Sequence, residues 1–361
     1  MKAWLADRNR PQIFRLFGYA GTGKTTLANH LAQFVVHPKK EKPNIMYAAF
    51  TGKAAMALQK KGCHGASTIH SLIYKMYLDN GKLKFRLHRE SPLANADLLV
   101  VDEVSMVNEH IGKDLESFGV PILVIGDPAQ LPPVHGAGYF TEHKPHVLLT
   151  EVHRQAADNP IIKLSMDVRQ GRGLSPVGGA VELLTRDDMP LASIVSNALV
   201  VDQVLCGKNK TRHMLNVRVR QELNRASSDP EVGDRLICLH NDHQLGVMNG
   251  SLWEVAKVAF FDEWEDAFTL IIDSIDDPSR KGLEVKVKGD FFRVEKPSYR
   301  WQEMRGTQQF TYGYAITVHK SQGSQWPHVL LIDESEVFRD DAARHLYTGL
   351  TRASERLTVI V

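Results

Sequence analysis

The sequence of 361 residues contains three cysteines and no long apolar run. The cysteines, Cys63, Cys206 and Cys238, lie far apart without CxxC spacing, so neither a disulfide framework nor a zinc site is indicated. No segment approaches the roughly 18 consecutive apolar residues of a membrane span. The N-terminal segment has no apolar stretch followed by a small-residue cleavage site. We therefore expect a cytoplasmic protein with reduced thiols and no membrane association.

The chain also lacks a strong excess of either charge. Its formal net charge is +2, which gives no argument for a nucleic-acid partner by itself. The charges are nevertheless unevenly distributed, because residues 208–225 are mainly basic and residues 262–277 mainly acidic. We interpret the two segments as lying in different surroundings, with two solvated faces that bind no partner as the alternative.

The apolar residues that are present, 43% of the chain, occur in short runs. In the first 150 residues each run is followed by Gly or acidic residues and then a helical pattern, which is typical of buried parallel strands. The runs are residues 13–17, 44–50, 97–103, 120–127 and 146–150. The pattern predicts a doubly wound α/β domain over residues 1–150. A hairpin insertion is predicted at residues 72–95, with its turn at Asn80-Gly81.

A second α/β unit is predicted over residues 151–361. Its expected strands are 197–201, 328–332 and 356–361, and its expected helices are 212–224 and 341–348. Residues 229–308 separate the halves of this unit and contain alternating strand-like pieces with Gly and Asp turns. We interpret this segment as a small inserted β-barrel.

The stretch GYAGTGKT, Gly18 to Thr25, fits the phosphate-loop pattern and lies between a predicted strand and a predicted helix. Its backbone N–H groups would wrap phosphates at a helix N-terminus. Lys24 would reach the β- and γ-phosphates, and the Thr25 hydroxyl would hold Mg²⁺. The predicted nucleotide-binding residues are Gly18, Gly21, Thr22, Gly23, Lys24, Thr25 and Thr26. A purely structural Gly-rich turn is the alternative.

Polar side chains follow two later strands of the same domain. Asp102 and Glu103 come after the run LLVV, where ligands collect in open α/β sheets. Asp102 suits the Mg²⁺ shell, and Glu103 suits deprotonation of the attacking water. Gln130 follows the next strand and could contact the γ-phosphate, although a loop amide bonded to backbone is the alternative.

Two arginines could stabilise the transition state of phosphoryl transfer. Arg154 and Arg352 both lie in the predicted second unit. An arginine inserted against the γ-phosphate contributes about 10³ to 10⁵ in rate. Because it would come from the other domain, hydrolysis would couple to domain closure. A surface ion pair is the alternative for either residue.

With these residues in place, the chain resembles superfamily 1 helicases of the RecD-like branch, which includes the phage Dda helicase. The similarity extends over nearly the whole chain. The matching stretches, in order, are 18–25, AAFTGKAA (48–55), ASTIHSL (66–72), VVDEVSM (100–106), IGDPAQLPPV (125–134), VHRQ (152–155), AITVHKSQG (315–323) and YTGLTRA (347–353).

The resemblance implies two RecA-like domains, termed 1A and 2A, with the hairpin 72–95 as insertion 1B and an SH3-like barrel at 229–308 as insertion 2B. It implies an ATP-dependent DNA helicase that moves 5′ to 3′ on single-stranded DNA, with ATP and Mg²⁺ bound. Thr25 and Asp102 would hold the metal, and Gln322 and Gly323 would lie near the nucleotide. We expect Trp326 to pack, with stacking as the alternative. The implied DNA-binding residues are Thr51, Lys53, Thr68, His70, Thr317 and His319. The expected partners of a monomer are single-stranded DNA, single-strand/duplex junctions, and replication, recombination or repair proteins.

The sequence departs from the family in two places. Relatives carry an adenine-reading Gln upstream of the phosphate loop, and Gln12 lies too close to the first strand to replace it. The 72–95 insertion is short for a strand-separating pin, and Phe85 is our candidate for a stacking wedge. The alternative function is a nucleotide-gated DNA-binding subunit of a recombination or nuclease complex. Small P-loop kinases form a third class, which leaves the second unit and Arg352 unexplained.

Overall fold

The computed structural model describes residues 2–7, 9–32, 43–79, 82–133, 136–151, 158–176, 178–186, 189–225, 227–242 and 244–361. The chain divides into two compact units, Met1–Arg169 and Gln170–Val361. The division falls later than the predicted boundary at residue 150, because the first unit includes helix α7 (Pro160–Arg169). Among the helices in the described ranges, none is long and apolar enough to span a membrane.

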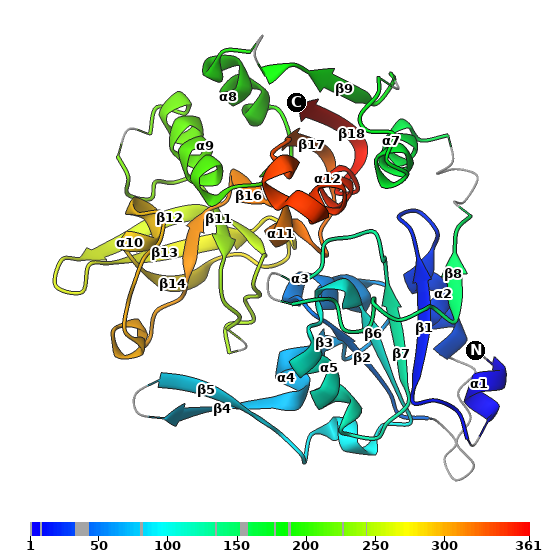
Figure 1. The fold of residues 1–361 in the computed structure, drawn as a ribbon. Helices are drawn as coiled ribbons and strands as arrows, with labels where there is room; N and C mark the ends of the chain where they lie inside the picture. Colours follow the sequence, from blue (N-terminus) through cyan, green and yellow to red (C-terminus); the bar gives the residue numbers. More distant parts are fainter. Residues whose placement is uncertain are drawn as a thin grey trace. The chain divides into compact units, whose positions relative to one another are not determined.

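The first unit is built on a parallel six-stranded sheet in the order β3-β2-β6-β7-β1-β8 (Figure 1). The strands are β1 (Ile13–Gly18), β2 (Ile45–Ala49), β3 (Ser67–Thr68), β6 (Leu98–Asp102), β7 (Ile122–Gly126) and β8 (Val147–Leu149). All five neighbouring pairs are parallel. The five apolar runs predicted as strands in this part of the chain are thus confirmed.

Both faces of this sheet are buried. Phe17 and Val101 belong to one core cluster, whereas their strand neighbours Leu16 and Val100 belong to a second cluster. Successive side chains in a strand point to opposite faces, so the two clusters lie on the two sides of the sheet. The helices are α1 (Lys2–Ala6), α2 (Lys24–Ala32), α3 (Gly52–Lys60), α4 (Ile69–Ile73), α5 (Glu109–Glu116) and α7. The prediction of a doubly wound α/β domain is confirmed.

A two-stranded antiparallel hairpin lies within the predicted insertion. It consists of β4 (Tyr74–Asp79) and β5 (Lys82–Leu87), and the turn residues Asn80 and Gly81 fall outside the described residues. Met76 and Phe85 are directly opposite each other and are 58% and 49% exposed. The hairpin therefore presents an apolar pair to solvent.

The second unit contains a parallel five-stranded sheet in the order β16-β10-β17-β18-β9. Its strands are β9 (Val181–Leu184), β10 (Gln203–Cys206), β16 (Ala315–Thr317), β17 (Trp326–Ile332) and β18 (Ala353–Ile360). Its helices include α8 (Leu191–Leu199), α9 (Asn209–Glu222), α11 (Val318–Ser321) and α12 (Ala342–Leu350). The helices predicted at 212–224 and 341–348 are confirmed within a few residues, and Trp326 is buried.

The prediction of a strand at residues 197–201 is wrong. Most of that run closes helix α8, in which Ile194, Val195 and Ala198 are buried at helical spacing. The strand begins later, at Gln203. A short apolar run that ends a helix cannot be distinguished from a buried strand by its periodicity alone.

The segment predicted as a barrel forms an antiparallel five-stranded sheet in the order β14-β13-β12-β11-β15. The strands are β11 (Arg235–Cys238), β12 (Leu252–Asp262), β13 (Ala267–Ser274), β14 (Leu283–Lys288) and β15 (Phe310–Tyr312), with the short helix α10 (Asp290–Arg293) after β14. Trp253 and Phe310 are fully buried in its core. A single bridge, Val287 to Gln308, joins β14 to the segment before β15. Closure into an SH3-like barrel stays a prediction.

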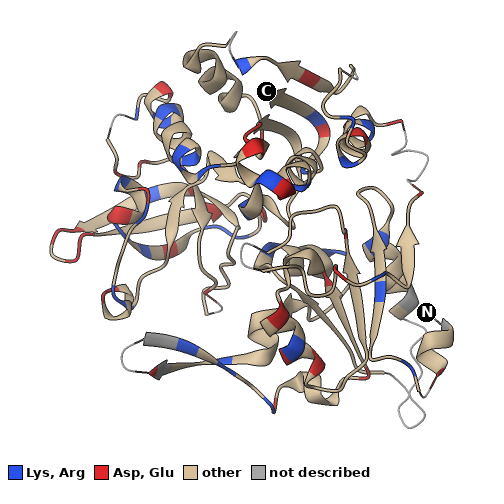
Figure 2. Cartoon of the chain, viewed as in Figure 1, with Lys and Arg blue, Asp and Glu red and all other residues tan. Residues whose placement is uncertain are grey.

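The basic segment 208–225 contains arginines that serve the fold. Figure 2 shows the Lys and Arg positions along α9. Arg220 is 3% exposed and donates from Nε to Asp234 Oδ1 at 3.0 Å, and Arg225 donates to the same oxygen at 2.9 Å. Two hydrogen-bonded cations on one buried carboxylate stabilise the junction of α9 and β11. Neither arginine is a solvated surface charge.

Candidate functional site

The carboxyl ends of three neighbouring strands bring the predicted nucleotide residues together in the first unit. Gly18 ends β1, Asp102 ends β6, and Gly126 ends β7, which lies between β1 and β6. Because the strands are parallel, these ends meet at one edge of the sheet. Figure 1 shows the loops that leave this edge, including the loop from β1 to α2.

The phosphate loop has the backbone that its glycines permit. Gly21 and Gly23 have φ values of 77° and 72°, in the region that favours glycine. A Cβ on Gly18 would lie 2.6 Å from Thr22 Oγ1, so the strand end tolerates no side chain there. Helix α2 begins at Lys24, and its N-terminus faces the loop, which favours bound anions.

Lys24 is held over the loop by two oxygens. Its Nζ donates to the carbonyl oxygen of Tyr19 at 3.0 Å and lies 3.9 Å from Asp127 Oδ2. Asp127 is 1% exposed, and it follows β7 directly. The ammonium group thus lies where it can exchange its contacts with protein oxygens for contacts with phosphate oxygens. Lys24 and Asp127 are far apart in the sequence, and no local pattern indicates this contact.

A hydrogen bond joins the phosphate loop to the predicted metal ligand. Thr25 Oγ1 donates to Asp102 Oδ2 at 2.9 Å, and the other oxygen, Oδ1, accepts from the backbone N of Glu103 at 2.8 Å. Hydroxyl and carboxylate oxygens are the ligands that Mg²⁺ prefers, usually together with substrate phosphates. The two predicted metal-holding residues are therefore adjacent.

Glu103 adopts a left-handed backbone conformation, with φ 54° and ψ 44°. This region costs a non-glycine residue about 1–2 kcal/mol, and such residues cluster at functional sites. The turn immediately after Asp102 gives the Glu103 side chain a direction that a continuing strand would not allow. The arrangement suits two carboxylates with separate roles.

Gln130 lies in the loop after β7 and is 6% exposed. Its Oε1 atom is buried, and no hydrogen-bond partner for it exists in the described part of the chain. A buried carbonyl oxygen without a donor costs about 1–3 kcal/mol. Such an acceptor fits an oriented water or another bound donor. The residues at this sheet edge therefore fit a nucleoside triphosphate with Mg²⁺.

Gln12 takes no part in this site. Its Nε2 donates to the carbonyl oxygens of Glu116 and Val120, at 2.9 and 3.0 Å. These contacts lie before β1, at the edge of the sheet opposite the phosphate loop. Gln12 therefore cannot replace the upstream adenine-reading glutamine.

Arg154 lies outside the described residues, whereas the structure describes the contacts of Arg352. Arg352 follows α12 and is 4% exposed. Its guanidinium donates to the carbonyl oxygens of Thr348 and Ser324 and to Thr351 Oγ1, at 3.0, 3.1 and 3.0 Å. No carboxylate pairs with it among the described residues, so the surface ion-pair alternative is excluded for Arg352.

The contact with Ser324 ties Arg352 to the loop that carries Gln322 and Gly323. Gln322 is 2% exposed, and Gly323 has a φ of 77°. The structure thus brings three residues predicted near the nucleotide together within the second unit.

The two units contain the same short turn at an edge strand of the parallel sheet. Thr68 ends β3 with φ −76° and ψ 150°, and its hydroxyl accepts from Ser71 N. Thr317 ends β16 with φ −77° and ψ 152°, and its hydroxyl accepts from Lys320 N. Each Thr is followed by a β-branched residue and then His. The repeated Thr-Ile-His and Thr-Val-His sequences could have revealed this equivalence before the structure did.

The two histidines of these turns lie among aromatic rings. His70 lies 5.9 Å from Phe50 and 6.3 Å from Phe85, between ring centroids. His319 lies 5.4 Å from Phe338. Burial lowers the pKa of both histidines, and for His319 Asp341 opposes the shift. Both rings are therefore neutral at pH 7 and contribute planar surface and one N–H donor.

Thr51 caps a third helix at the sheet edge of the first unit. Its hydroxyl accepts from Ala54 N at 3.2 Å at the start of α3, and Lys53 lies in the first turn. The predicted DNA-binding threonines are thus all helix N-caps. Their placement is known within each unit, and their role in DNA binding stays a prediction.

Comparison with known proteins bears on this geometry. Residues 2–189, just over half of the chain, match the family model described as an AAA domain, and residues 312–360 match a UvrD-like helicase C-terminal domain. The ATP-dependent RecD2 DNA helicase of Deinococcus radiodurans is 31% identical over 94% of this chain. The chain belongs to the superfamily 1 helicases of the RecD type. The mixed α/β fold and the resemblance of the motifs agree with this membership.

This helicase-family chain is shorter than its relatives. It spans 46% of RecD2 from D. radiodurans, and 67% of the RecBCD enzyme subunit RecD of Mycolicibacterium smegmatis, which is 26% identical over 96% of this chain. Bacteroides Pif1, solved bound to single-stranded DNA, aligns with a TM-score of 0.61 at 18% identity over 96% of this chain and 88% of that chain. Candida albicans Pif1 aligns at 0.57 and 19% over 97% and 91%. These structures share the fold.

Proposed function

We propose that the chain is a DNA-stimulated ATPase that translocates 5′ to 3′ on single-stranded DNA and unwinds duplex DNA. The observation that carries the proposal is the hydrogen bond from Thr25 to Asp102. It joins a phosphate loop to a strand-end carboxylate at the edge where Glu103 and Gln130 also lie. Such a cluster positions a triphosphate and an attacking water, which is most of what phosphoryl transfer requires from a protein.

The roles of the residues follow from their contacts. Lys24 would exchange its contacts with Tyr19 and Asp127 for the β- and γ-phosphates. Bound Mg²⁺, held by Thr25 and Asp102, would supply charge neutralisation at the phosphates. Glu103 would accept a proton from the attacking water, and the buried Oε1 of Gln130 would orient that water.

The DNA track would include the paired turns at Thr68–His70 and Thr317–His319. The support is their shared backbone geometry and their Thr-capped, aromatic-flanked form in both units. Neutral histidines and backbone donors suit a strand bound without regard to sequence. The 5′ to 3′ direction is the one that the RecD-like branch implies. Arg352 would serve as the arginine that couples hydrolysis to closure of the two units.

The first test is ATP hydrolysis with and without single-stranded DNA. The wild-type chain should show strong stimulation by DNA. Lys24→Ala and Glu103→Gln should each lower kcat by at least about 10², while binding of single-stranded DNA stays within a few-fold. Glu109→Gln is the matched control, because Glu109 is an exposed helix residue paired with Lys113.

Two results would contradict this assignment. Full DNA-stimulated hydrolysis by either variant would remove that residue from the mechanism. Hydrolysis by the wild-type chain that ignores DNA would favour the small-kinase class of P-loop proteins.

A second candidate is a DNA-binding subunit that unwinds little by itself. The observation that favours it is the match to a protein named as a subunit of RecBCD, which is 26% identical over 96% of this chain. Displacement of streptavidin from oligonucleotides biotinylated at either end separates the two candidates. Faster release from the 3′ end supports 5′ to 3′ translocation, and no release from either end supports the subunit.

A further inference from the structure

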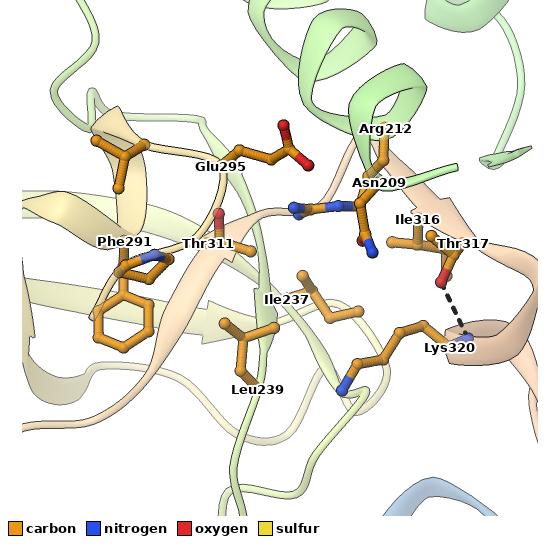
Figure 3. Close-up of a pocket in the computed structure, with 12 residues that line it drawn as sticks. Asn209, Arg212, Ile237, Leu239, Phe291, Glu295, Thr311, Ile316, Thr317 and Lys320 are labelled. Atoms are coloured by element: carbon orange, nitrogen blue, oxygen red, sulfur yellow. Dashed lines mark hydrogen bonds between the residues drawn. The ribbon is translucent and has the colours of Figure 1, made fainter. Parts of the chain in front are cut away.

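The second unit contains a pocket of about 130 Å³ that no motif assigned above explains. Figure 3 shows it between α9, the end of β11, the segment after α10, and the turn that carries Thr317 and Lys320. We call it the Arg212 pocket. Its walls come from four separate segments between Asn209 and Lys320, so no local pattern predicts it.

One wall of the Arg212 pocket is polar and carries two cations. Arg212 and Lys320 approach from different elements, and Asn209 and Thr317 lie between them on the same side (Figure 3). The Arg212 Nε atom is buried, and within the described ranges it has no hydrogen-bond partner. Lys320 donates to the neutral Asn249 Oδ1 at 2.8 Å. The wall therefore has an unused donor at Arg212 Nε and two positive charges, against which the pocket lining sets one carboxylate, that of Glu295.

The surroundings of the pocket disfavour the charged form of both cations. The walls of the pocket desolvate Lys320, although the residue keeps access to solvent, and this desolvation together with the charge of Arg212 lowers the pKa of Lys320. Burial also lowers the pKa of Arg212, against the opposing effect of Glu295. An anion placed between the two groups would relieve both costs.

The start of helix α9 does not provide the anion site by itself. Glu334 already occupies it, because its carboxylate accepts from the backbone N of Gly207 and Lys208 and from Thr211 Oγ1, at 3.0, 2.9 and 2.6 Å. A phosphate in the pocket would therefore be bound by the side chains of Arg212, Lys320 and Asn209. Arginine suits this task because its planar fork matches phosphate oxygens.

The opposite wall of the pocket is apolar. Ile237 is buried, Phe291 is 7% exposed, and Leu239 is partly buried beside them. A free inorganic anion would gain nothing from this surface. A ligand that combines a phosphate with a sugar and a planar base would use both walls.

We propose that the Arg212 pocket binds one nucleotide unit of single-stranded DNA, with its phosphate between Arg212 and Lys320 and its base or sugar against Phe291 and Leu239. This inference rests on the proposed function, since it takes the strand to be the ligand. Thr317 and Lys320 belong to the predicted DNA turn and also line the pocket, so the site continues the proposed track. The inserted sheet would then contribute directly to holding the strand.

Glu295 makes the sign of the charge effect testable. It is the one carboxylate among the residues that line the pocket. Its negative charge attracts Arg212 and would repel a phosphate. Glu295→Gln should therefore bind single-stranded DNA more tightly, by about threefold at low salt. Arg212→Ala should bind it about tenfold more weakly and lower the slope of log Kd against log salt by about one.

The experiment measures fluorescence anisotropy of a labelled oligo-dT with the full chain over a salt series. Arg218→Ala is the matched control, because Arg218 lies on the same helix, is exposed, and donates to Gln221 outside the pocket. It should change the affinity by less than about twofold. An oligonucleotide with abasic sites should bind more weakly than oligo-dT if the apolar wall holds a base. Thermal unfolding of each variant shows whether the fold is kept.

Opposite shifts for Glu295→Gln and Arg212→Ala support the proposal. Unchanged affinity in both, or shifts in the same direction, overturns it, and so does competition by free dTMP as strong as that by oligo-dT. If the wild-type chain binds DNA and shows DNA-stimulated hydrolysis while Arg212→Ala binds normally, the pocket inference alone fails. If the wild-type chain binds no DNA, both the pocket and the proposed function fail.

Discussion

At the scale of single residues, His345 is a buried polar group that the nucleotide site does not use. It lies on α12 with 1% exposure, and neither ring nitrogen has a hydrogen-bond partner within the described residues. The ring stacks on Phe338 with centroids 4.0 Å apart, and His319 is 6.1 Å away. Burial, with a smaller effect of His319, lowers the pKa of His345 to about 3.

This pKa predicts a dependence of stability on pH. The unfolded His345 has the ordinary value near 6.5, so the unfolded state binds the extra proton between that value and about 3. Above about pH 6.5 His345 is neutral in both states, and the free energy of unfolding is not reduced by its protonation. As the pH falls below this value, protonation of the unfolded state lowers the free energy of unfolding by up to about 1.4 kcal/mol per pH unit. His345→Leu should remove this contribution and flatten the curve.

Urea unfolding at about pH 7 and about pH 4.5 measures the difference. His345→Leu should be at least as stable as the wild type at the higher pH, because a buried unpaired polar group is replaced by an apolar one of similar size. His64→Leu, at an exposed position, is the control and should keep the wild-type dependence. Equal slopes in the wild type and His345→Leu would assign the acid sensitivity to other groups.

Local sequence was sufficient to predict those candidate residues that belong to one short motif. Lys24, Thr25, Asp102 and Glu103 follow from short motifs, because a phosphate loop and a strand-end carboxylate are local features. Other features depend on segments that are distant in the sequence. They are the unpaired oxygen of Gln130, the contact of Lys24 with Asp127, and the hydrogen bonds of Arg352 to carbonyl oxygens. A sequence without an alignment contains no signal for them.

At the scale of elements, the hairpin β4–β5 offers a test of strand separation. Phe85 and Met76 face each other across the strands and are both exposed, which is unusual for large apolar side chains placed side by side. Phe85 also lies 6.3 Å from His70, between ring centroids. The hairpin is thus continuous with the turn at Thr68.

We expect Phe85→Ala to lower the rate of duplex unwinding several-fold while DNA-stimulated ATP hydrolysis stays near the wild-type value, because one base–aromatic stack is worth about 1–3 kcal/mol. Val232→Ala is the control, since Val232 is 60% exposed and lies in the second unit. Strand displacement of a duplex with a 5′ tail is the measurement. Equal loss of both activities would mean that Phe85 acts in DNA binding or folding and not in separation.

The elements themselves were predictable to different degrees. The buried parallel strands of the first unit were found because each is a short, mainly apolar run followed by a loop. The end of α8 was misread as a strand because its apolar residues are contiguous in sequence. The Arg212 pocket could not be predicted, since its walls come from α9, β11, the segment near Glu295, and β16.

At the scale of the whole molecule, hydrolysis should require both units. Arg352 is the arginine that we propose for this coupling, and within the described residues its guanidinium bonds to two carbonyl oxygens and one hydroxyl and to no acid. These are contacts that a phosphate could replace in part. Arg352→Ala should lower kcat by about 10³ or more while binding of the nucleotide is retained.

The measurement is single-turnover hydrolysis together with binding of a fluorescent nucleotide. Arg356→Ala, at an exposed arginine on β18, is the matched control. Because Arg352→Ala removes the donor of the Ser324 carbonyl oxygen, whereas the Thr348 carbonyl still accepts from Thr351 Oγ1, its thermal unfolding must be measured. Arg352→Lys should recover stability without recovering turnover. Wild-type kcat in Arg352→Ala would separate the second unit from catalysis.

The paired turns at Thr68 and Thr317 have backbone angles that agree within a few degrees. If both turns contact the strand as we propose, two binding elements of the same shape suit a ligand whose backbone repeats, and they suit less well a ligand whose successive parts differ. Sequence-specific recognition of individual bases would favour binding elements of different shape. The affinity of the chain for single-stranded DNA should therefore not depend on the order of the bases. A chemically modified backbone linkage that prevents binding to one turn should also prevent binding to the other turn.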